Sequence, residues 1–295
     1  CVTMALAMFR NMLSGEHGVL GINGRNLDLI YPLNDRKHFP NVDDKLLCKK
    51  LLSEAGIPVP KTYHVIDSPS ALDGWTKSVG NTDSFVVKPN CGYGGNGIIL
   101  VRRDGDGWVV GGEPCTEEDI SFHVLEIFNG AFSRDNVSDT AYMEQMVVNH
   151  RDLAQFIGEG VSGVADMRLI FRETELVMAM MRLPTRKSGG RANLHQGGLG
   201  IGIDISNGKS LQGCQGNDVI SHHPETGEPL PDKSIPFWRE MAESGSRISD
   251  VVGLGYIGVD FVCDDTEGPL VLEVNARPGL NIQIANQAGL RARLI

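Results

Sequence analysis

The sequence predicts an α+β fold in which short β-hairpins alternate with a few helices. Near the C-terminus, residues 258–275 contain two strand-like runs separated by a turn of polar residues and glycine. Residues 41–56 carry a helical pattern that starts at polar capping residues, continues as a leucine stripe and stops at Gly56. A strand, a helix and a second, apolar strand follow one another between residues 63 and 89. Together these patterns favour a mixed α+β protein.

The C-terminal hairpin also carries the residues that first point to a function. Because side chains alternate along a strand, Glu273 and Asn275 share one face of it. The opposite face is aliphatic and comprises Leu270, Leu272 and Val274. An antiparallel neighbour can bring Asp260 to the polar face, and three oxygen ligands of this kind suit Mg²⁺ with the phosphates of a nucleotide. The simpler alternative is a surface hairpin whose polar face is merely solvated.

Composition places the chain among ordinary globular proteins. It has 295 residues, 41% of them apolar and 22% charged, which is enough for one multi-lobed enzyme or two domains. The formal net charge of −10 argues against a nucleic-acid-binding protein, which needs a basic face. The six cysteines include no CxxC pair, so reduced thiols in a cytoplasmic protein are expected. The apolar residues 1–10 predict a short helix rather than a membrane span.

The remaining elements follow from local patterns of apolar and turn-forming residues. Residues 18–22 and 27–31 predict a small strand pair around a turn at 23–26. The unit between 63 and 89 comprises strand 63–66, helix 68–79 and strand 85–89. Further along, we expect a hairpin over 98–110, a helix over 117–130, strands at 141–148, 167–172 and 176–183, a glycine-rich loop at 188–202, turns with a small hairpin at 204–234 and a helix over 237–252.

Lys88 ends the apolar strand 85–89 and opens a glycine-rich turn. The sheet would bury the stem of this lysine and leave its ammonium group at the strand end. The glycines of the turn let backbone N–H groups face a polyanion without obstruction by side chains; they are Gly92, Gly94, Gly95 and Gly97. The spacing is not that of a P-loop, because the lysine precedes the glycines, and an ordinary glycine-rich hairpin is the alternative.

Lys45 and Glu144 stand where charged side chains are unexpected. Lys45 lies at the start of a capped helix, where the helix dipole disfavours a cation. Glu144 enters an otherwise apolar strand, and a buried carboxylate requires a partner. An adenine amino group would be such a partner, with the backbone of residues 145–147 meeting the rest of the ring. A surface lysine and a salt-bridged glutamate on an edge strand are the alternatives.

A basic cluster follows within residues 168–195. Arg168 and Arg182 lie in adjacent predicted strands, each between apolar residues, and Arg191, Asn193 and His195 follow in the glycine-rich loop. Guanidinium groups suit phosphate and carboxylate, and the glycines favour a loop that closes over a ligand. A disordered basic loop is the alternative, and His195 alone is more often structural than a base.

Seven motifs appear in order along the chain. They are Asp44-Lys45, Lys88-Pro89 with its glycine loop, Glu144-Gln145, Asp166-Met167-Arg168, Asn193-Leu194-His195-Gln196-Gly197-Gly198, Gly258-Val259-Asp260 and Glu273-Val274-Asn275-Ala276-Arg277-Pro278-Gly279-Leu280. Each motif alone is weak, but the ordered set resembles the ATP-grasp superfamily, and most closely the RimK-type α-L-glutamate ligases. Those enzymes carry a fuller N-terminal domain than the about 44 residues that precede Lys45, so a shortened N-terminal region is expected.

The resemblance implies an ATP-grasp fold, in which two α+β lobes clasp ATP. It divides the chain into an N-terminal region (1–62), a small lobe with the glycine loop (63–143) and a large lobe with the metal site (144–295). The residues that it places on ATP are Lys45, Lys88, Gly92, Gly94, Gly95, Gly97, Glu144, Gln145 and Val147. The metal ligands would be Asp260, Glu273 and Asn275, holding two Mg²⁺ ions, with Mn²⁺ as an alternative. The catalytic residues would be Arg168, Arg182, Arg191 and Asn193, and the substrate contacts His195, Arg277 and Arg25.

The function that the resemblance implies is a carboxylate–amine ligase. ATP would convert a carboxylate into an acyl phosphate, and an amine would then displace phosphate to form an amide or peptide bond. The acid would be an amino acid such as glutamate, and the acceptor an amine or a peptide. An ATP-grasp kinase with a hydroxyl acceptor and a non-catalytic ATP-binding module are the alternatives. A cytoplasmic protein is expected, with neither a nucleic acid nor a membrane as partner. The sequence leaves its oligomeric state open, with a homo-oligomer as one option.

Overall fold

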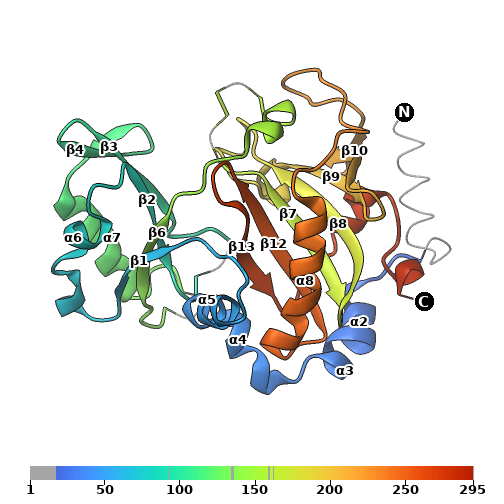
Figure 1. Cartoon of the computed structure of the whole chain (residues 1–295), viewed down its shortest axis with the longest axis horizontal. Helices are drawn as coiled ribbons and strands as arrows, with labels where there is room; N and C mark the ends of the chain where they lie inside the picture. The colour runs from blue at the N-terminus through green and yellow to red at the C-terminus, as the bar shows by residue number, and fades with distance from the viewer. Residues whose placement is uncertain (1–17, 93, 134–135, 159, 162, 295) are drawn as a thin grey trace. The chain divides into compact units, whose positions relative to one another are not determined.

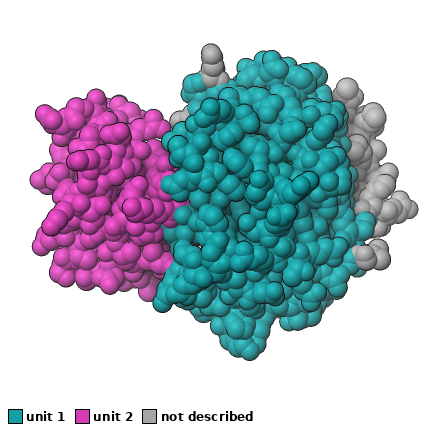
Figure 2. Space-filling model, viewed as in Figure 1, with its two compact units in different colours: residues 1–43, 47–59, 148–295 teal, residues 44–46, 60–147 magenta. Residues whose placement is uncertain are grey.

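The structure of the protein, a computed structural model, describes residues 18–294 except positions 93, 134–135, 159 and 162. The described chain forms two compact units (Figure 2). Unit 2 comprises Asp44–Leu46 and Pro60–Val147, and unit 1 comprises the other described residues. The helix predicted at residues 1–10 lies outside the described part of the chain. The division into regions 1–62, 63–143 and 144–295 remains a prediction.

Unit 2 is built on a six-stranded antiparallel sheet with the strand order β1-β6-β2-β3-β4-β5 (Figure 1). The rings of Trp75, Phe85 and Trp108 fill its core, with centroids between 5.2 and 6.2 Å apart. The elements are β1 (Thr62–Ile66), η3 (Pro69–Leu72), α6 (Trp75–Val79), β2 (Ser84–Pro89), β3 (Ile99–Asp104), β4 (Gly107–Val110), β5 (Glu113–Cys115), α7 (Glu117–Phe128) and β6 (Ala141–Gln145).

Unit 1 is built on a seven-stranded antiparallel sheet with the strand order β11-β10-β9-β8-β7-β12-β13. Its strands are β7 (Asp166–Arg172), β8 (Glu175–Leu183), β9 (Leu199–Asp204), β10 (Lys209–Gln215), β11 (Asp218–Ile220), β12 (Tyr256–Asp264) and β13 (Gly268–Asn275). Its helices are α2 (Ile22–Arg25), η1 (Asn26–Ile30), α3 (Tyr31–Leu33), η2 (Arg36–His38), α4 (Pro40–Asp43), η4 (Arg151–Gln155), η5 (Leu194–Gln196), α8 (Trp238–Val252), α9 (Ile282–Asn286) and η6 (Arg291–Arg293). Helix α5 (Lys45–Glu54) begins in unit 2 and ends in unit 1.

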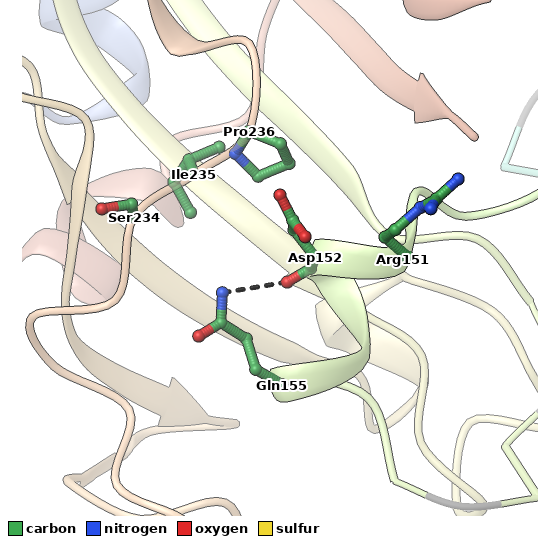
Figure 3. Close-up of a pocket in the computed structure, with 6 residues that line it drawn as sticks. All are labelled: Arg151, Asp152, Gln155, Ser234, Ile235 and Pro236. Atoms are coloured by element: carbon green, nitrogen blue, oxygen red, sulfur yellow. Dashed lines mark hydrogen bonds between the residues drawn. The ribbon is translucent and has the colours of Figure 1, made fainter. Parts of the chain in front are cut away.

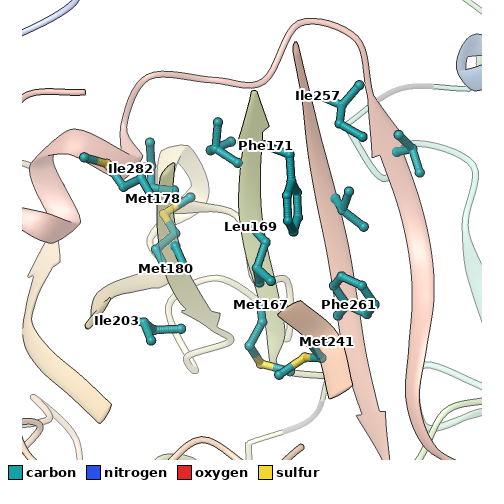
Figure 4. Packing of buried hydrophobic residues seen from close by; sticks show 14 of the residues in the cluster. Met167, Leu169, Phe171, Met178, Met180, Ile203, Met241, Ile257, Phe261 and Ile282 are labelled. Carbon is teal, nitrogen blue, oxygen red and sulfur yellow. The ribbon is translucent and has the colours of Figure 1, made fainter. Parts of the chain in front are cut away.

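Helices α8 and α9 cover opposite faces of the unit 1 sheet. Gly245 of α8 lies against the ring of Phe171, whereas a Cβ at Gly202 of β9 would lie 2.7 Å from the carbonyl oxygen of Ala285 in α9. Figure 4 shows the same arrangement, with Met241 of α8 beside Met167 and Phe261, and Ile282 of α9 beside Met178 and Met180. This packing leaves the polar positions of β7, β8 and β12 on the α9 side.

Most predicted strands are confirmed, and so are the helices over 117–130 and 237–252. The strand pair predicted at 18–31 is wrong, because this segment forms α2, the π-helix η1 and α3. The backbone of Leu20 is satisfied by the Gln283 side chain, which accepts from its N–H at 2.8 Å and donates to its C=O at 2.9 Å. Leu29 and Ile30 are both buried, as neighbours on a helix can be and neighbours on a half-exposed strand cannot.

Three further predictions need correction. The helix predicted over 41–56 is two helices, α4 and α5. The first N–H groups of α5 have no partner within the helix, and that of Leu46 donates to Asn90 Oδ1 at 2.8 Å. The helix predicted over 68–79 is interrupted at Gly74, which has φ +89°. The loop predicted at 188–202 already contains η5 and the first residues of β9, because Leu199 and Ile201 are buried between small glycines.

The hairpin of β12 and β13 is confirmed, with a bulge. Asp260 pairs with Glu273, but Phe261 pairs with Val271, so Leu272 is the extra residue on β13. Simple alternation predicted that Leu272 would lie on the aliphatic face with Val274. Because of the bulge, Val271 takes this place in the main core. The bulge lies beyond Glu273 and leaves Asp260, Glu273 and Asn275 on one face. Among the described residues, no helix has both the length and the apolar character that crossing a bilayer requires.

Candidate active site

Four charged side chains form an ion-pair network on the α9 side of the unit 1 sheet. Asp260 of β12 lies opposite Arg168 of β7, and Arg182 of β8 lies opposite Asp166 of β7. Arg168 donates through Nε and Nη2 to the two carboxylate oxygens of Asp260, at 2.7 and 2.6 Å. Arg182 bridges both aspartates, with Nε 2.6 Å from Asp166 Oδ1 and Nη2 2.8 Å from Asp260 Oδ2. Two arginines thus balance two aspartates.

This network is buried, and its protonation reflects that burial. Exposure of the four side chains lies between 3% and 16%. Burial opposes ionisation of Asp260, but Arg168 and Arg182 outweigh it and hold the pKa of Asp260 below its usual range. Burial raises the pKa of Asp166 to about 6, although Arg182 limits the rise. Burial also disfavours the Arg182 cation, but the two carboxylates raise its pKa above the ordinary value, so it stays charged.

Glu273 and Asn275 extend the polar face beside Asp260, as the sequence predicts. Glu273 pairs with Asp260 across the hairpin, and Asn275 Nδ2 lies 3.4 Å from Asp260 Oδ2. Both side chains are half-buried. Two carboxylates and an amide oxygen are donors that Mg²⁺ accepts, so the chemistry of this set fits the ion. Within the described residues, no group of three or more His, Cys, Asp or Glu side chains offers a metal site.

Unit 2 contains a second buried ion pair, between Lys88 of β2 and Glu144 of β6. The Lys88 side chain is 13% exposed and the Glu144 side chain 3%. Strand β6 lies between β1 and β2, so Glu144 is not on an edge strand. The neighbouring Gln145 accepts the Lys61 N–H at 3.1 Å through Oε1, and Val147 is buried. The sheet therefore holds the predicted lysine and glutamate side by side.

Lys45 lies against the start of the glycine loop. Its Nζ donates to the carbonyl oxygens of Asn90 and Gly92, at 3.1 and 2.6 Å. Asn90 in turn accepts a hydrogen bond from the Leu46 N–H through its side chain. Asn90 therefore joins the start of α5 to the loop through both its carbonyl oxygen and its side chain. The cation that the helix dipole disfavours is thus stabilised by carbonyl dipoles.

The glycine loop is shaped by close contacts and by a carboxylate beneath it. Gly97 has φ +74°, and a Cβ there would lie 2.6 Å from the ring of Phe132. The buried Asp139 accepts the Cys91 N–H through both oxygens, at 3.1 and 2.9 Å. Burial, with Asp139 nearby, raises the pKa of the Cys91 thiol to about 11, so this thiol is not a nucleophile at neutral pH.

The loop that carries Arg191, Asn193 and His195 is ordered by its own contacts. Asn193 Oδ1 accepts the His195 N–H at 3.0 Å and caps η5. Arg191 is exposed, with Nη1 3.5 Å from Gln196 Oε1. His195 is exposed, and its Nε2 lies 3.4 Å from Asn281 Nδ2, beyond the Arg-Pro-Gly turn. The side-chain contacts of Arg191, Asn193 and His195 described here reach only Gln196, the η5 backbone and Asn281.

Arg277 belongs to the turn that follows β13, and Arg25 contacts the same turn. Arg25 Nη1 donates to the carbonyl oxygen of Pro278 at 2.9 Å, and its Nη2 donates to Asn26 at 2.9 Å. Arg277 is exposed and stacks over the ring of Phe39, with 4.4 Å from its guanidinium carbon to the ring centroid. In this arrangement Arg25 braces the turn, and Arg277 is the more accessible of the two.

Comparison with known families places the chain in one of them. The sequence profile of a family described as sugar-transfer associated ATP-grasp matches residues 24–295. The chain belongs to this ATP-grasp family. The resemblance and the α+β ATP-grasp fold that the ordered motifs predict are therefore confirmed, whereas the sugar-transfer associated branch was not foreseen.

Relatives with names agree with the ATP-grasp assignment. A probable α-L-glutamate ligase of Pseudomonas putida is 26% identical over 251 residues, which cover 85% of this chain and 61% of that protein. The cyanophycin synthetase of a Synechocystis species is 25% identical, over 84% of this chain and 28% of that protein. The crystal structure of a biotin carboxylase–β-γ-ATP complex from Campylobacter jejuni shares the fold, with TM-score 0.52, 14% identity, and coverage of 85% of this chain and 44% of that one. The chain spans about three fifths of the glutamate ligases that it matches.

The structure shows contacts at the candidate site for residues of this ATP-grasp chain to which the sequence analysis gave no role. Asp166 belongs to a predicted motif but had no assigned role, although alternation along β7 already places it on the same face as Arg168. Asn90 and Asp139 hold the glycine loop, and Asn281 approaches His195. These three are separated from their partners by 44 to 86 residues, and no local pattern pairs them.

A shallow hollow of about 350 Å³ lies elsewhere in unit 1 of the ATP-grasp chain (Figure 3). Its lining comes from η4 and from the segment before α8, and includes Asp152, Gln155 and Pro236. Gln155 Nε2 donates to the carbonyl oxygen of Asp152 at 2.9 Å. None of the predicted site residues lines this hollow, so it is separate from the candidate active site.

Proposed function

We propose that the protein is an ATP-dependent ligase that joins a carboxylate to an amine through an acyl-phosphate intermediate. The observation that carries the proposal is the buried network of Arg168, Arg182 and Asp260 beside Glu273 and Asn275. It sets two guanidinium groups, which suit phosphoryl oxygens, against a group of oxygen donors for a divalent cation. Membership of an ATP-grasp family and similarity to proteins named as ligases support the same class of reaction.

Unit 2 supplies the residues that we assign to the nucleotide. Lys45 and Lys88 would pair with the α- and β-phosphates, and the charged phosphate oxygens would replace the carbonyl acceptors of Lys45. The N–H groups of the loop with Gly92, Gly94, Gly95 and Gly97 would meet the β- and γ-phosphates. Glu144 would accept from the adenine amino group while keeping Lys88 as its ion-pair partner.

Unit 1 supplies the residues that we assign to the cation and to the transferred phosphoryl group. Asp260, Glu273 and Asn275 would hold Mg²⁺, and we propose two ions with Mn²⁺ as an effective substitute. A bound Mg²⁺ supplies charge neutralisation on the phosphoryl oxygens. Arg168 and Arg182 would stabilise the negative charge that spreads over the same oxygens during transfer. Arg191 and Asn193 would reach the γ-phosphate and the acyl phosphate when their loop closes, and the closed loop would exclude water from the acyl phosphate.

The reaction would proceed in two balanced steps. A carboxylate oxygen attacks the γ-phosphorus, the bond to the β,γ-bridging oxygen breaks, and ADP leaves with the acyl phosphate behind. The amine nitrogen then attacks the carbonyl carbon, the C–O bond to phosphate breaks, and the nitrogen loses one proton as phosphate departs. Positioning of the reactants and stabilisation of charge supply the catalysis, so no protein nucleophile is required.

For the substrates, we propose an amino acid such as glutamate as the acid and an amine or a peptide as the acceptor. The names of the relatives support this class, since one is a probable α-L-glutamate ligase and another a cyanophycin synthetase. His195, Arg277 and Arg25 are the residues that we assign to substrate. Their cationic or polar groups would meet a second carboxylate of the acid. His195 and Arg277 are exposed, whereas Arg25 is half-buried.

The decisive experiment follows ADP release over a panel of amino acids and short peptides, with hydroxylamine as a trap. A ligase releases ADP only with its carboxylate, and mass spectrometry detects the hydroxamate of that acid. A phosphate ester on a hydroxyl would instead identify a kinase. Binding of ATP without any turnover across the panel would identify a non-catalytic module. The Glu273→Ala variant, tested in parallel, controls for contaminating ATPase.

A further inference from the structure

Asp166 is a buried carboxylate that the proposed reaction does not use. It begins β7, two residues before Arg168 and on the same face of the sheet. Its Oδ1 accepts from Arg182 Nε at 2.6 Å, with the side chains of Asp166 and Arg182 only 10% and 16% exposed. The same guanidinium reaches Asp260 through Nη2, so Arg182 is shared between two carboxylates. Arg182 is therefore held by Asp166 as well as by Asp260.

The oxygens of Asp260 are already occupied by nitrogen donors. Oδ1 accepts from Arg168 Nε, and Oδ2 faces Arg168 Nη2, Arg182 Nη2 and the more distant Asn275 Nδ2. Each carboxylate oxygen offers about two lone-pair positions, so three donors crowd Oδ2 while Oδ1 has one. Coordination of a cation through Oδ2 therefore requires at least one of its donors to move away.

We infer that Arg168 and Arg182 form a clamp on Asp260 that opens when the divalent cation binds, and that Asp166 is the positioning residue that retains Arg182 when it opens. The inference rests on the proposed function, because it takes Asp260 as a metal ligand. Arg182 is the mobile member of the clamp, since it has a second carboxylate to hold it. Arg168 places Nε and Nη2 on Asp260, and no second carboxylate pairs with it among the described residues.

The clamp makes opposite predictions for the two residues on which it depends. Removing the Asp166 charge leaves Asp260 as the ionised partner of Arg182, so the clamp tightens and the cation binds more weakly. Arg182→Lys keeps the positive charge but loses the fork that reaches both carboxylates, so the clamp loosens and the cation binds more tightly. A role in folding alone would weaken binding in both variants. A purely electrostatic role would leave Arg182→Lys unchanged, because its charge is that of the wild type.

The test measures Mn²⁺ binding by electron paramagnetic resonance, with Mn²⁺ alone and with Mn²⁺ and ADP, in the wild type, Asp166→Asn and Arg182→Lys. We expect Kd to rise about tenfold in Asp166→Asn and to fall by about the same factor in Arg182→Lys, the scale of one charge-assisted hydrogen bond. The matched control is Arg172→Gln, which removes a positive charge from the same strand, β7. The Arg172 side chain donates to the carbonyl oxygen of Leu294 and lies outside the clamp. Its Kd should stay within about twofold of the wild type.

Each outcome separates the clamp from the proposed function. An Arg182→Lys variant that melts like the wild type but binds Mn²⁺ equally or more weakly overturns the clamp, and the ligase reaction then stands on its own product analysis. If the wild type binds no Mn²⁺ with or without ADP, the metal site and the proposed function both fall. If Asp166→Asn fails to fold, Arg182→Lys alone still decides. A structure of the Mn²⁺–ADP complex in which Arg182 Nη2 stays bonded to Asp260 would also contradict the clamp.

Discussion

Lys88 and Glu144 form an ion pair across neighbouring strands of unit 2, with only 3% of the Glu144 side chain exposed. Removing one partner of a buried ion pair is destabilising, typically by about 3–5 kcal/mol. We therefore expect Lys88→Met to lower the free energy of unfolding by about 3 kcal/mol. Replacing both residues, as in Lys88→Met/Glu144→Met, should restore most of that loss. Urea denaturation of the two single variants and the double variant measures the coupling.

The same cycle tests the role of the pair in nucleotide binding. If the pair serves ATP, the double variant is stable but no longer binds ATP, which isothermal titration calorimetry can show. A double variant that recovers stability and also retains ATP affinity would mean that Lys88 and Glu144 are structural only. Lys50→Met offers a matched control, because its ion pair with Glu54 is exposed and should contribute less than about 1 kcal/mol.

Asp264 predicts an acid-sensitive contribution to stability. Burial opposes its ionisation, but N–H donors from Val148, Thr266 and Glu267 hold the pKa of Asp264 below its usual range. A depressed pKa means that the ionised form stabilises the fold above the unfolded pKa of about 3.9, and that this stabilisation is lost as pH falls through the lower folded value. We expect Asp264→Asn to be less stable than the wild type at pH 7, with a difference that shrinks below about pH 4.

Thermal unfolding of both proteins from pH 2 to pH 7 measures this difference. Asp232→Asn is a suitable control, because Asp232 is exposed in a turn of unit 1 and lies outside the Asp264 contacts. A stability difference between Asp264→Asn and the wild type that is constant across this pH range would show that the carboxylate charge at position 264 does not matter.

The polar face that we propose as the metal half of the site was predictable because it depends on short-range rules. Alternation along a strand places Glu273 and Asn275 on one face, and a hairpin turn brings Asp260 opposite them. The adjacent strands of Arg168 and Arg182 follow from the same periodicity. The bulge at Leu272 was not predictable, since nothing in the local pattern identifies which residue is extra.

Features that depend on contacts between distant parts of the chain could not be predicted from the sequence. The N-terminal segment reads as strand-like by its apolar runs, yet Gln283, 263 residues away, satisfies the backbone of Leu20. In the same way, Lys45 finds carbonyl acceptors at Asn90 and Gly92 that only the folded unit brings near. Propensity is a weak prior, and tertiary hydrogen bonds of this kind override it.

Glu273→Ala should abolish ADP formation while the fold survives. Glu273 is half-buried on the polar face, so its loss removes a proposed ligand and a charge but creates little cavity. We expect turnover to fall by at least about 10²-fold, as expected when charge stabilisation of the transition state is removed, with Tm nearly unchanged. Coupled measurement of ADP release and circular dichroism checks both. Glu175→Ala, at the exposed start of β8, is the matched control, and full activity of Glu273→Ala would remove Glu273 from the site.

Gly97→Ala should disturb the glycine loop more than Gly94→Ala. Both glycines have positive φ, so alanine is strained at each position by about 1 kcal/mol. At Gly97 the new methyl group would also meet the Phe132 ring at 2.6 Å, whereas at Gly94 nothing lies within 4 Å. The two variants therefore share the backbone strain and differ only in the contact. We expect Gly97→Ala to lose a further 1–3 kcal/mol, about the cost of overpacking, and to raise KM for ATP more. Equal losses of stability in the two variants would show that Phe132 does not support the loop.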